Sequence, residues 1–324
     1  QFKLCAHRSS FLGISCLSTV MAVLSCFLAL TVLAKSASSS YNETEAIMYA
    51  EYARISFCQQ STIESWTCGE MCNAVEVPAR VRFLPTSRWR VQGFVAEMTG
   101  RHCIMSFRGS VDMRNWDADL DAINRPWPES SAPWCRNCRV HEGFASAYKD
   151  VRPLVLEAIQ EMECKTIGVV GHSFGGGLAT LAGIDLQAGL GLAVKPVYTL
   201  GSPRVGNAAF EEAFSLAANR SSRFPAQWRI VHHHDPVPHL PPRLLPVPGE
   251  WNYHHTPQEV WYNKNSGDYK LCDPVHGEDL SCSRSLMPAS LVNLDHVNYF
   301  NRTFRRREMP KECTGLAPEE VVIL

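Results

Sequence analysis

The sequence predicts an α/β fold with a mainly parallel central sheet flanked by helices. Strand-like and helix-like segments alternate over residues 91–231, as they do where each strand is followed by a crossover helix. In particular, the apolar run Thr166–Val170 leads through Gly171–Gly176 into a helix rich in small residues. Proline-dense stretches at 126–133 and 236–248 are expected to be loops over the carboxyl edge of the sheet, where α/β active sites lie.

The predicted elements form one domain, residues 43–324. Helical apolar spacing over residues 43–57 predicts its first helix, and two strand-like runs joined by a Thr-Gly turn follow. The elements expected after the first helix are strands 91–96 and 103–107, helix 144–162, strand 166–170, strand 197–200, helix 208–218 and strand 228–231. Neither a repeat nor a linker divides this region.

The first 34 residues are expected to be a targeting segment. Lys3 and Arg8 precede an uncharged stretch from Ser9 to Ala34, and residues 35–42 form a Ser-rich spacer. A charged start followed by an apolar run is typical of a secretory signal peptide, but this run is also long enough for an uncleaved signal anchor in a membrane. Because the positive charge lies on the N-terminal side, the rest of the chain is predicted to be secreted or lumenal in either case.

Sequons and cysteines agree with export. Asn42, Asn219 and Asn301 each begin an Asn-x-Ser/Thr sequon, the acceptor pattern for N-glycosylation. Of the thirteen cysteines, Cys5, Cys16 and Cys26 lie in the targeting segment, which leaves ten. Two close pairs, Cys68 with Cys72 and Cys135 with Cys138, could form a four-thiolate zinc site. An oxidising compartment favours local disulfides instead.

The remaining cysteines lie farther apart. Cys272 and Cys282 flank a polar loop that a disulfide could close, and Cys58 and Cys313 stand near the two ends of the domain. Cys103 and Cys164 lie in or beside predicted strands and are expected to be buried thiols.

The charge pattern excludes a nucleic-acid partner. The chain has 31 basic and 32 acidic residues, for a formal net charge of -1, and no basic block is interleaved with aromatic residues.

Ser173 is the predicted nucleophile. A strand, the motif Gly-x-Ser-x-Gly and a helix in direct succession are the setting of a nucleophile elbow, in which the serine occupies a strained, tight turn. Glycines two residues before and after the serine keep side chains out of the strand–helix crossing. The alternative is that Ser173 only caps the helix.

A serine hydroxyl needs a base, and the base needs an acid to orient it. After an elbow serine the acid comes next in the chain and the histidine last. Asp235 follows the predicted strand 228–231 and is the expected acid, and His296, on a loop ahead of the final predicted helix, is the expected base. The other acids considered are Asp185, Asp268, Asp273 and Asp279. The other histidines after Asp235 are His239, His254, His255 and His276.

The run His232-His233-His234 beside Asp235 suggests a metal site, since imidazoles cluster there with a carboxylate. In an extended strand only His232 and His234 would share a face, so no metal is expected. His172, inside the elbow, is expected to be a packed structural residue rather than a second base.

The reaction also needs backbone N–H donors for the oxyanion. The residue after the nucleophile, Phe174, is expected to supply one of them, and Ser110, just after the strand 103–107, the other.

Five motifs now stand in order along the chain: Ser106–Ser110, Val140–Phe144, Gly171–Gly176, Gly201–Asn207 and Asp235–Pro242. Together they resemble the class 3 lipases, the fungal type typified by Rhizomucor and Thermomyces triacylglycerol lipases, over about residues 45–313. The resemblance implies an α/β-hydrolase fold with a short helical lid. It assigns the triad and the oxyanion hole to the same five residues. It also implies the disulfides Cys58–Cys313, Cys68–Cys72, Cys135–Cys138 and Cys272–Cys282.

The resemblance places the lid at residues 111–120. Met113, Trp116 and Leu120 fall at helical spacing there and would form its apolar face. Asp117 departs from the lipase pattern, which has an apolar residue at that position, and the neighbouring aspartates make the lid more polar. Related feruloyl esterases have polar lids. The alternative for Trp116 is a core aromatic on an ordinary helix.

The sequence therefore predicts a secreted serine esterase that hydrolyses acyl esters of glycerolipids through an acyl-enzyme and needs no cofactor. The alternatives are a phospholipase A1, a feruloyl-type carbohydrate esterase and, in a different class, a non-catalytic binding module on the same fold. The expected partner is a lipid or ester substrate at a lipid–water interface, and we expect a monomer.

Overall fold

The computed structural model describes residues 41–85, 89–110, 123–127, 135–220, 227–243, 252–274, 277–286 and 294–315. The predicted targeting segment, residues 1–34, lies outside these residues, as does the predicted lid. In the part of the chain that is described, no helix has both the length and the apolar composition that crossing a bilayer requires.

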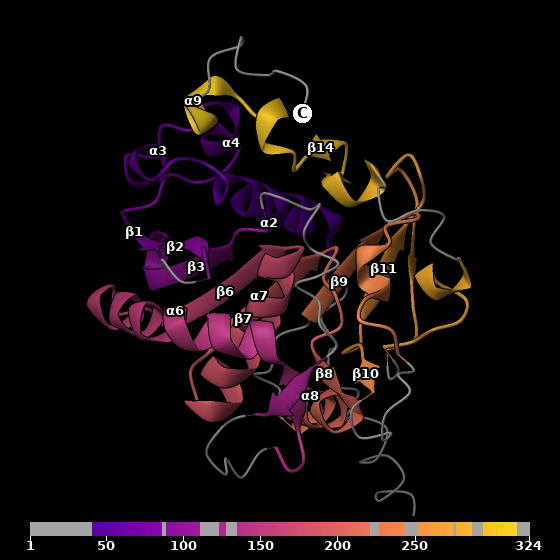
Figure 1. The fold of residues 1–324 in the computed structure, drawn as a ribbon. Coiled ribbons are helices and arrows are strands. Elements are labelled where there is room, and N and C mark those ends of the chain that lie inside the picture. Colours follow the sequence, from indigo (N-terminus) through magenta and orange to yellow (C-terminus); the bar gives the residue numbers. More distant parts are fainter. Residues whose placement is uncertain are drawn as a thin grey trace, which may run out of the picture. The chain divides into compact units, whose positions relative to one another are not determined.

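A central sheet of eight strands organises the domain (Figure 1). Its order is β1 (Arg80–Pro85), β2 (Gln92–Glu97), β3 (His102–Phe107), β6 (Thr166–His172), β7 (Val194–Leu200), β9 (Gln227–His232), β11 (Glu259–Tyr262) and β12 (Tyr269–Leu271). The pairs from β3 through β11 are parallel, and only the outer pairs are antiparallel. The predicted α/β fold with a mainly parallel sheet is confirmed.

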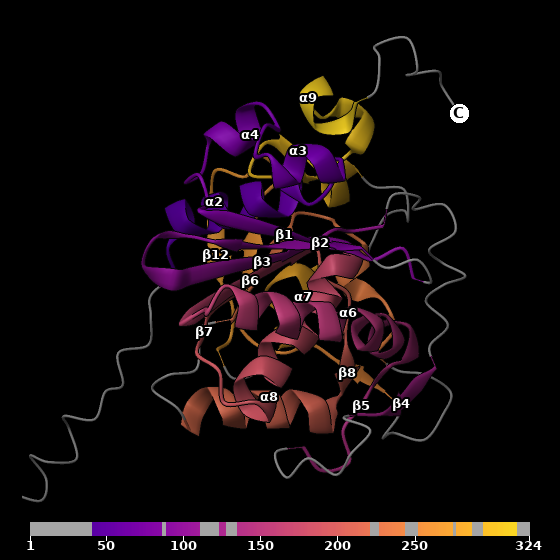
Figure 2. The same ribbon diagram turned by 90° about the vertical axis from the view of Figure 1, so that its left-hand side faces the viewer.

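Helices cover both faces of this sheet (Figure 2). On one face lie α6 (Glu142–Glu161), α7 (Phe174–Ile184) and α8 (Ala208–Arg220), and on the other lie α2 (Glu43–Ile55), α3 (Gln60–Glu64), α4 (Glu70–Asn73) and α9 (Lys311–Thr314). Successive strand side chains point to opposite faces, so Val169 joins the core beneath α6 and α7, whereas Val170 joins the core beneath α2.

Smaller elements complete the described chain. A second sheet contains β10 (Tyr253–His254), β8 (Gly206–Asn207), β5 (Arg139–His141) and β4 (Asn124–Pro126). A separate hairpin pairs β13 (Asn298–Tyr299) with β14 (Arg302–Thr303). The short helical turns are η1 (Thr99–Arg101), η2 (Asp185–Gly189), η3 (Val237–His239), η5 (Ser283–Ser285), η6 (Leu294–Val297) and η7 (Arg306–Glu308).

One element differs from the expectation in a way that matters for the site. The segment after His296 was expected to be a final helix, but it is the β13–β14 hairpin. Its two-residue turn is Phe300-Asn301, and both residues have positive φ, 55° and 57°. Such a turn matches the twist of the two strands and favours Asn. The hairpin returns the chain beside His296 and brings Tyr299 into the site.

Five disulfides join described cysteines. Four are the pairs that the family resemblance implies: Cys58–Cys313, Cys68–Cys72, Cys135–Cys138 and Cys272–Cys282. The fifth joins Cys103 to Cys164, so the expectation of two buried thiols is wrong. Cys103 lies near the start of β3, and Cys164 lies just before the start of β6. Because these strands are parallel neighbours, their amino ends lie side by side and the two cysteines meet there.

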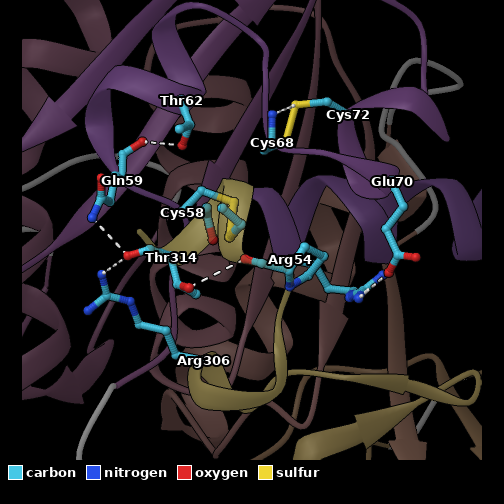
Figure 3. The surroundings of a disulfide bond; sticks show 12 residues. Arg54, Cys58, Gln59, Thr62, Cys68, Glu70, Cys72, Arg306 and Thr314 are labelled. Atoms are coloured by element: carbon cyan, nitrogen blue, oxygen red, sulfur yellow. Dashed lines mark hydrogen bonds and ion pairs between the residues drawn. A yellow bond between two sulfur atoms is a disulfide. The ribbon is translucent and has the colours of Figure 1, made fainter. Parts of the chain in front are cut away.

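The Cys58–Cys313 disulfide connects the helical layer near the N-terminus to the chain that follows the hairpin (Figure 3). Hydrogen bonds reinforce it: Gln59 N donates to Cys313 O at 2.9 Å, and Gln59 Nε2 donates to Thr314 O at 2.8 Å. Both ends of the domain are thus held together at one place.

Candidate active site

The elbow has the geometry that its sequence requires. Ser173 lies between β6 and α7 with φ 57° and ψ -124°, a region that L-residues rarely occupy. A Cβ at Gly171 would lie 2.0 Å from Gly175 O, and one at Gly175 would lie 2.2 Å from Phe107 O. Only glycine fits at these two positions. Ser173 is fully buried, and its Oγ has no hydrogen-bond partner among the described residues.

The structure brings His296 and Asp235 together. The Nδ1 atom of His296 lies 2.9 Å and 2.8 Å from the two carboxylate oxygens of Asp235, and both side chains are fully buried. Asp235 follows β9, and its Oδ1 also accepts a 2.9 Å hydrogen bond from Val237 N. Burial alone would raise the pKa of Asp235. The charge of His296 and the hydrogen bonds that Asp235 accepts outweigh burial, so the pKa of Asp235 is lowered.

Two further residues lie against the Asp235 carboxylate, and neither was proposed as a site residue from the sequence. The Tyr299 hydroxyl donates to Asp235 Oδ2 and accepts from His232 N at 3.4 Å. Gly201 follows β7 with φ 57°, and a Cβ there would lie 2.6 Å from Asp235 Oδ2 and 3.0 Å from His296 Cε1. The glycine of the motif Gly201–Asn207 was a usable signal, whereas nothing in the sequence distinguishes Tyr299 from other tyrosines.

His172 is a packed residue that supports the loop of His296. Its Nε2 donates to the carbonyl oxygen of His296 at 2.7 Å, and its ring stacks on Phe304 at a centroid distance of 4.3 Å. Burial, together with the charge of His296, lowers the pKa of His172 to about 3. The ring is therefore neutral at physiological pH.

The expected oxyanion donors lie on the two segments that meet at the elbow. Phe174 is the first residue of α7, and Ser110 follows the end of β3 and is partly buried. A Cβ at Gly109 would lie 2.9 Å from His172 O and 3.1 Å from Ser173 Cβ, so the chain leading to Ser110 runs against the nucleophile. This close approach is the arrangement that an oxyanion hole needs.

Two of the other candidates, Asp185 and His255, have partners outside the proposed triad. Asp185 accepts from Arg152 Nε at 2.6 Å and from the Tyr148 hydroxyl at 2.9 Å, and both of these partners lie on α6. His255 Nε2 lies 2.6 Å from Pro238 O.

The histidine run differs from the expected extended strand. β9 ends at His232, and His233 turns away with φ 40°. His232 Nδ1 lies 3.1 Å from the backbone oxygen of Asp295, and His233 Nδ1 lies 2.9 Å from its carboxylate. The cluster with metal-ligand spacing that the described residues do contain, Glu259 with Cys272 and Cys282, includes two disulfide-bonded cysteines, which are not thiolate ligands.

The remaining predicted positions are the lid and the glycosylation sites. Met113, Trp116 and Leu120 of the predicted lid lie outside the described residues. Among the predicted glycosylation sites, Asn301 is exposed in the hairpin turn, and Asn42 caps α2 by accepting from Glu45 N at 3.1 Å. Asn219 lies in α8.

Comparisons with known proteins agree with this geometry. The family model described as lipase (class 3) matches residues 104–245. The lipase of Rhizomucor miehei is 30% identical over 273 residues, which cover 82% of this chain and 70% of that protein. The chain belongs to the class 3 lipase family.

Further lipases are similar to this chain. One solved structure is that of a triacylglycerol lipase whose catalytic centre is described as a serine protease triad. It has a TM-score of 0.65 and 30% identity to this chain, and the match covers 81% of this chain and 95% of that one. A secreted mono- and diacylglycerol lipase of Penicillium camembertii is 32% identical over 192 residues, which cover 56% of this chain and 57% of that protein. Membership of this family makes the chain a carboxylic ester hydrolase of the α/β-hydrolase fold.

Proposed function

We propose that the protein hydrolyses acyl esters of glycerolipids, with Ser173 as nucleophile, His296 as base and Asp235 as the acid that orients it. The observation that carries this proposal is the buried His296–Asp235 pair on the loops next to a buried serine in a strained elbow. The glycerolipid substrate is supported by the relatives, which are described as triacylglycerol, monoacylglycerol and diacylglycerol lipases.

In this mechanism Asp235 accepts the Nδ1–H of His296, which leaves Nε2 available to take the proton of Ser173 Oγ. Ser173 then attacks the ester carbonyl carbon, and the carbonyl oxygen becomes an oxyanion. We assign its two donors to the backbone N–H groups of Phe174 and Ser110. A preorganised donor of this kind contributes roughly 3–4 kcal/mol in serine hydrolases.

The second half of the reaction reuses the same groups. The imidazolium of His296 gives its proton to the leaving alcohol, and the acyl group remains on Ser173. Water then attacks the acyl carbon with His296 again as base, the bond from that carbon to Ser173 Oγ breaks, and His296 returns the proton to Ser173 as the carboxylic acid leaves. The low pKa of Asp235 keeps its carboxylate charged, so it stabilises the imidazolium throughout. No step requires a cofactor.

A substrate panel tests the proposal. Purified protein is assayed on triglyceride, diglyceride, phospholipid and a feruloyl ester, with Ser173→Ala as the inactive variant. Ser215→Ala, on α8, is the matched control, because its hydroxyl donates to Glu211 of the same helix at 3.0 Å. We expect glycerides to be hydrolysed and Ser173→Ala to reduce the rate by at least about 10⁴-fold.

Other outcomes of the panel favour the alternatives. Preferred release of one fatty acid from phospholipid would indicate a phospholipase A1, and turnover of the feruloyl ester alone would indicate a carbohydrate esterase. Unchanged activity in Ser173→Ala would reject the nucleophile. No turnover of any ester by folded wild-type protein would favour a binding module.

We also propose that the domain acts after export, in an oxidising compartment. Five disulfides among the described residues and an exposed sequon at Asn301 support this location. The Penicillium relative is described as secreted. Mass spectrometry of the N-terminus of the exported protein distinguishes a cleaved signal from an anchor: cleavage near Ala34 supports the signal, and an intact N-terminus retained in the membrane supports the anchor.

A further inference from the structure

The histidines at the end of β9 contact the residue next to the proposed base. Asp295 immediately precedes His296 in η6. Its carboxylate Oδ2 lies 2.9 Å from His233 Nδ1 and accepts from His234 N at 3.2 Å. The segment that carries His296 is therefore held by side-chain and backbone groups that lie more than sixty residues earlier in the chain.

The side chain of His232 contacts the backbone of the same segment. Its Nδ1 lies 3.1 Å from Asp295 O, and its Nε2 lies 3.2 Å from Lys264 O. A carbonyl oxygen can only accept, and one tautomer of the imidazole carries one N–H, so each tautomer donates in one of these two contacts. Because His232 is buried at the end of a central strand, it joins the loop of His296 to the sheet.

The group that contacts the carboxylate is itself fixed to the sheet. The backbone N–H of His233 donates to Tyr262 O at 2.9 Å, and the Trp261 indole N–H donates to His233 O at 3.1 Å. Both partners belong to β11, the parallel neighbour of β9. The imidazole of His233 thus projects from a rigid base towards Asp295.

We infer that His233 and Asp295 are positioning residues that hold His296 in register with Asp235 and Ser173; this inference rests on the proposed function. The two side chains are 26% and 18% exposed, and a partly exposed contact of this kind contributes little to stability. Its position matters more: a displacement of about 1 Å in a reacting group can reduce a rate about 100-fold.

The contact is tested by a double-mutant cycle. We expect His233→Ala and Asp295→Ala each to reduce kcat about tenfold with KM unchanged, because the substrate-binding surface is intact while His296 is displaced. The double variant should be no slower than Asp295→Ala alone, since that variant already removes the contact with His233 as well as the acceptor of His234 N. His233→Asn, which keeps an N–H donor, should restore kcat to within about threefold of the wild type.

A second readout separates this inference from the proposed function. A fluorophosphonate probe phosphonylates an activated serine with loss of fluoride, and its rate depends on the base but not on the choice of ester. Absence of labelling at Ser173 in the wild type would reject the proposed function. Labelling of the wild type, with His233→Ala and Asp295→Ala labelled at the same rate, would reject the positioning role alone.

The control variant is Glu308→Ala. It removes a carboxylate that contacts Arg305 at 2.8 Å in a more exposed pair and that also accepts from the Thr303 hydroxyl of β14 at 2.9 Å. We expect wild-type kcat and labelling rates from it. Thermal unfolding of all variants should give Tm values within a few degrees of the wild type. Additive losses of kcat in the double variant would contradict the inference.

Discussion

The Tyr299 hydroxyl donates a hydrogen bond to Oδ2 of Asp235, and both side chains are buried. Burial raises the pKa of Tyr299 well above its usual value, and the charge of Asp235 adds to this effect, so the phenol stays neutral and remains a donor. Tyr299 lies three residues after His296, on β13. One short segment therefore supplies both the proposed base and a second group that orients the acid.

Tyr299→Phe is expected to lower the free energy of unfolding by about 1.5–3 kcal/mol, because the variant loses a buried hydrogen bond to a charged group. Urea unfolding measures this loss. Activity should fall as well, since Asp235 loses one of the donors that hold it.

The control for that variant is Tyr148→Phe. Its hydroxyl donates to Asp185 at 2.9 Å, outside the site, so it should cost similar stability without lowering kcat. Equal kcat in the two variants would contradict an orienting role for Tyr299.

Gly201→Ala is expected to reduce kcat about 100-fold or more, because its Cβ would lie 2.6 Å from Asp235 Oδ2 and would displace the acid. Positive φ adds backbone strain of about 1–2 kcal/mol. Gly191→Ala isolates the strain, since Gly191 has φ 70° with nothing within 4 Å of an added Cβ. Steady-state kinetics of the two variants should therefore differ even though both are destabilised. Similar kcat values would show that the space beside Asp235 is unimportant.

The buried His172 predicts a pH dependence of stability. Its pKa is about 3 in the folded protein and about 6.5 in an unfolded chain. Between these values the unfolded chain binds a proton that the folded protein does not. The free energy of unfolding should therefore fall as the pH decreases from about 6.5 towards 3, by up to about 1.4 kcal/mol per pH unit from this group.

Urea unfolding at several pH values between 4 and 8 tests this dependence. His172→Gln keeps an N–H donor for His296 O but cannot titrate, so its stability should depend less on pH than that of the wild type. Parallel curves for the two proteins would mean that another buried group is responsible.

The predicted lid gives a kinetic expectation. If Met113, Trp116 and Leu120 form an apolar face over the site, the rate on a short-chain triglyceride should rise abruptly when the substrate passes from solution to emulsion. Trp116→Ser should reduce the rate on emulsion more than the rate on dissolved substrate. A smooth rate curve, unchanged in this variant, would place Trp116 in an ordinary core.

Chain order accounts for much of the predicted site. The elbow is local, so the motif around Ser173 and the strand and helix beside it could be predicted from a few adjacent residues. Asp235 could be predicted because it follows a strand, and His296 because it comes last. Tyr299 could not be predicted, since a β13–β14 hairpin rather than a helix brings it back to the acid.

The sequence by itself determined the α/β class, the strained serine turn and the order in which the proposed triad residues follow one another, because these depend on local periodicity and on glycines at fixed spacing. Only the tertiary structure decided the Cys103–Cys164 disulfide, the Gly201 clearance beside Asp235 and the contact of His233 with Asp295. Each of these joins residues that lie far apart in the chain. The first two lie at the ends of neighbouring parallel strands, β3 with β6 and β7 with β9, and the third joins the end of β9 to η6, so only the packed structure brings them together.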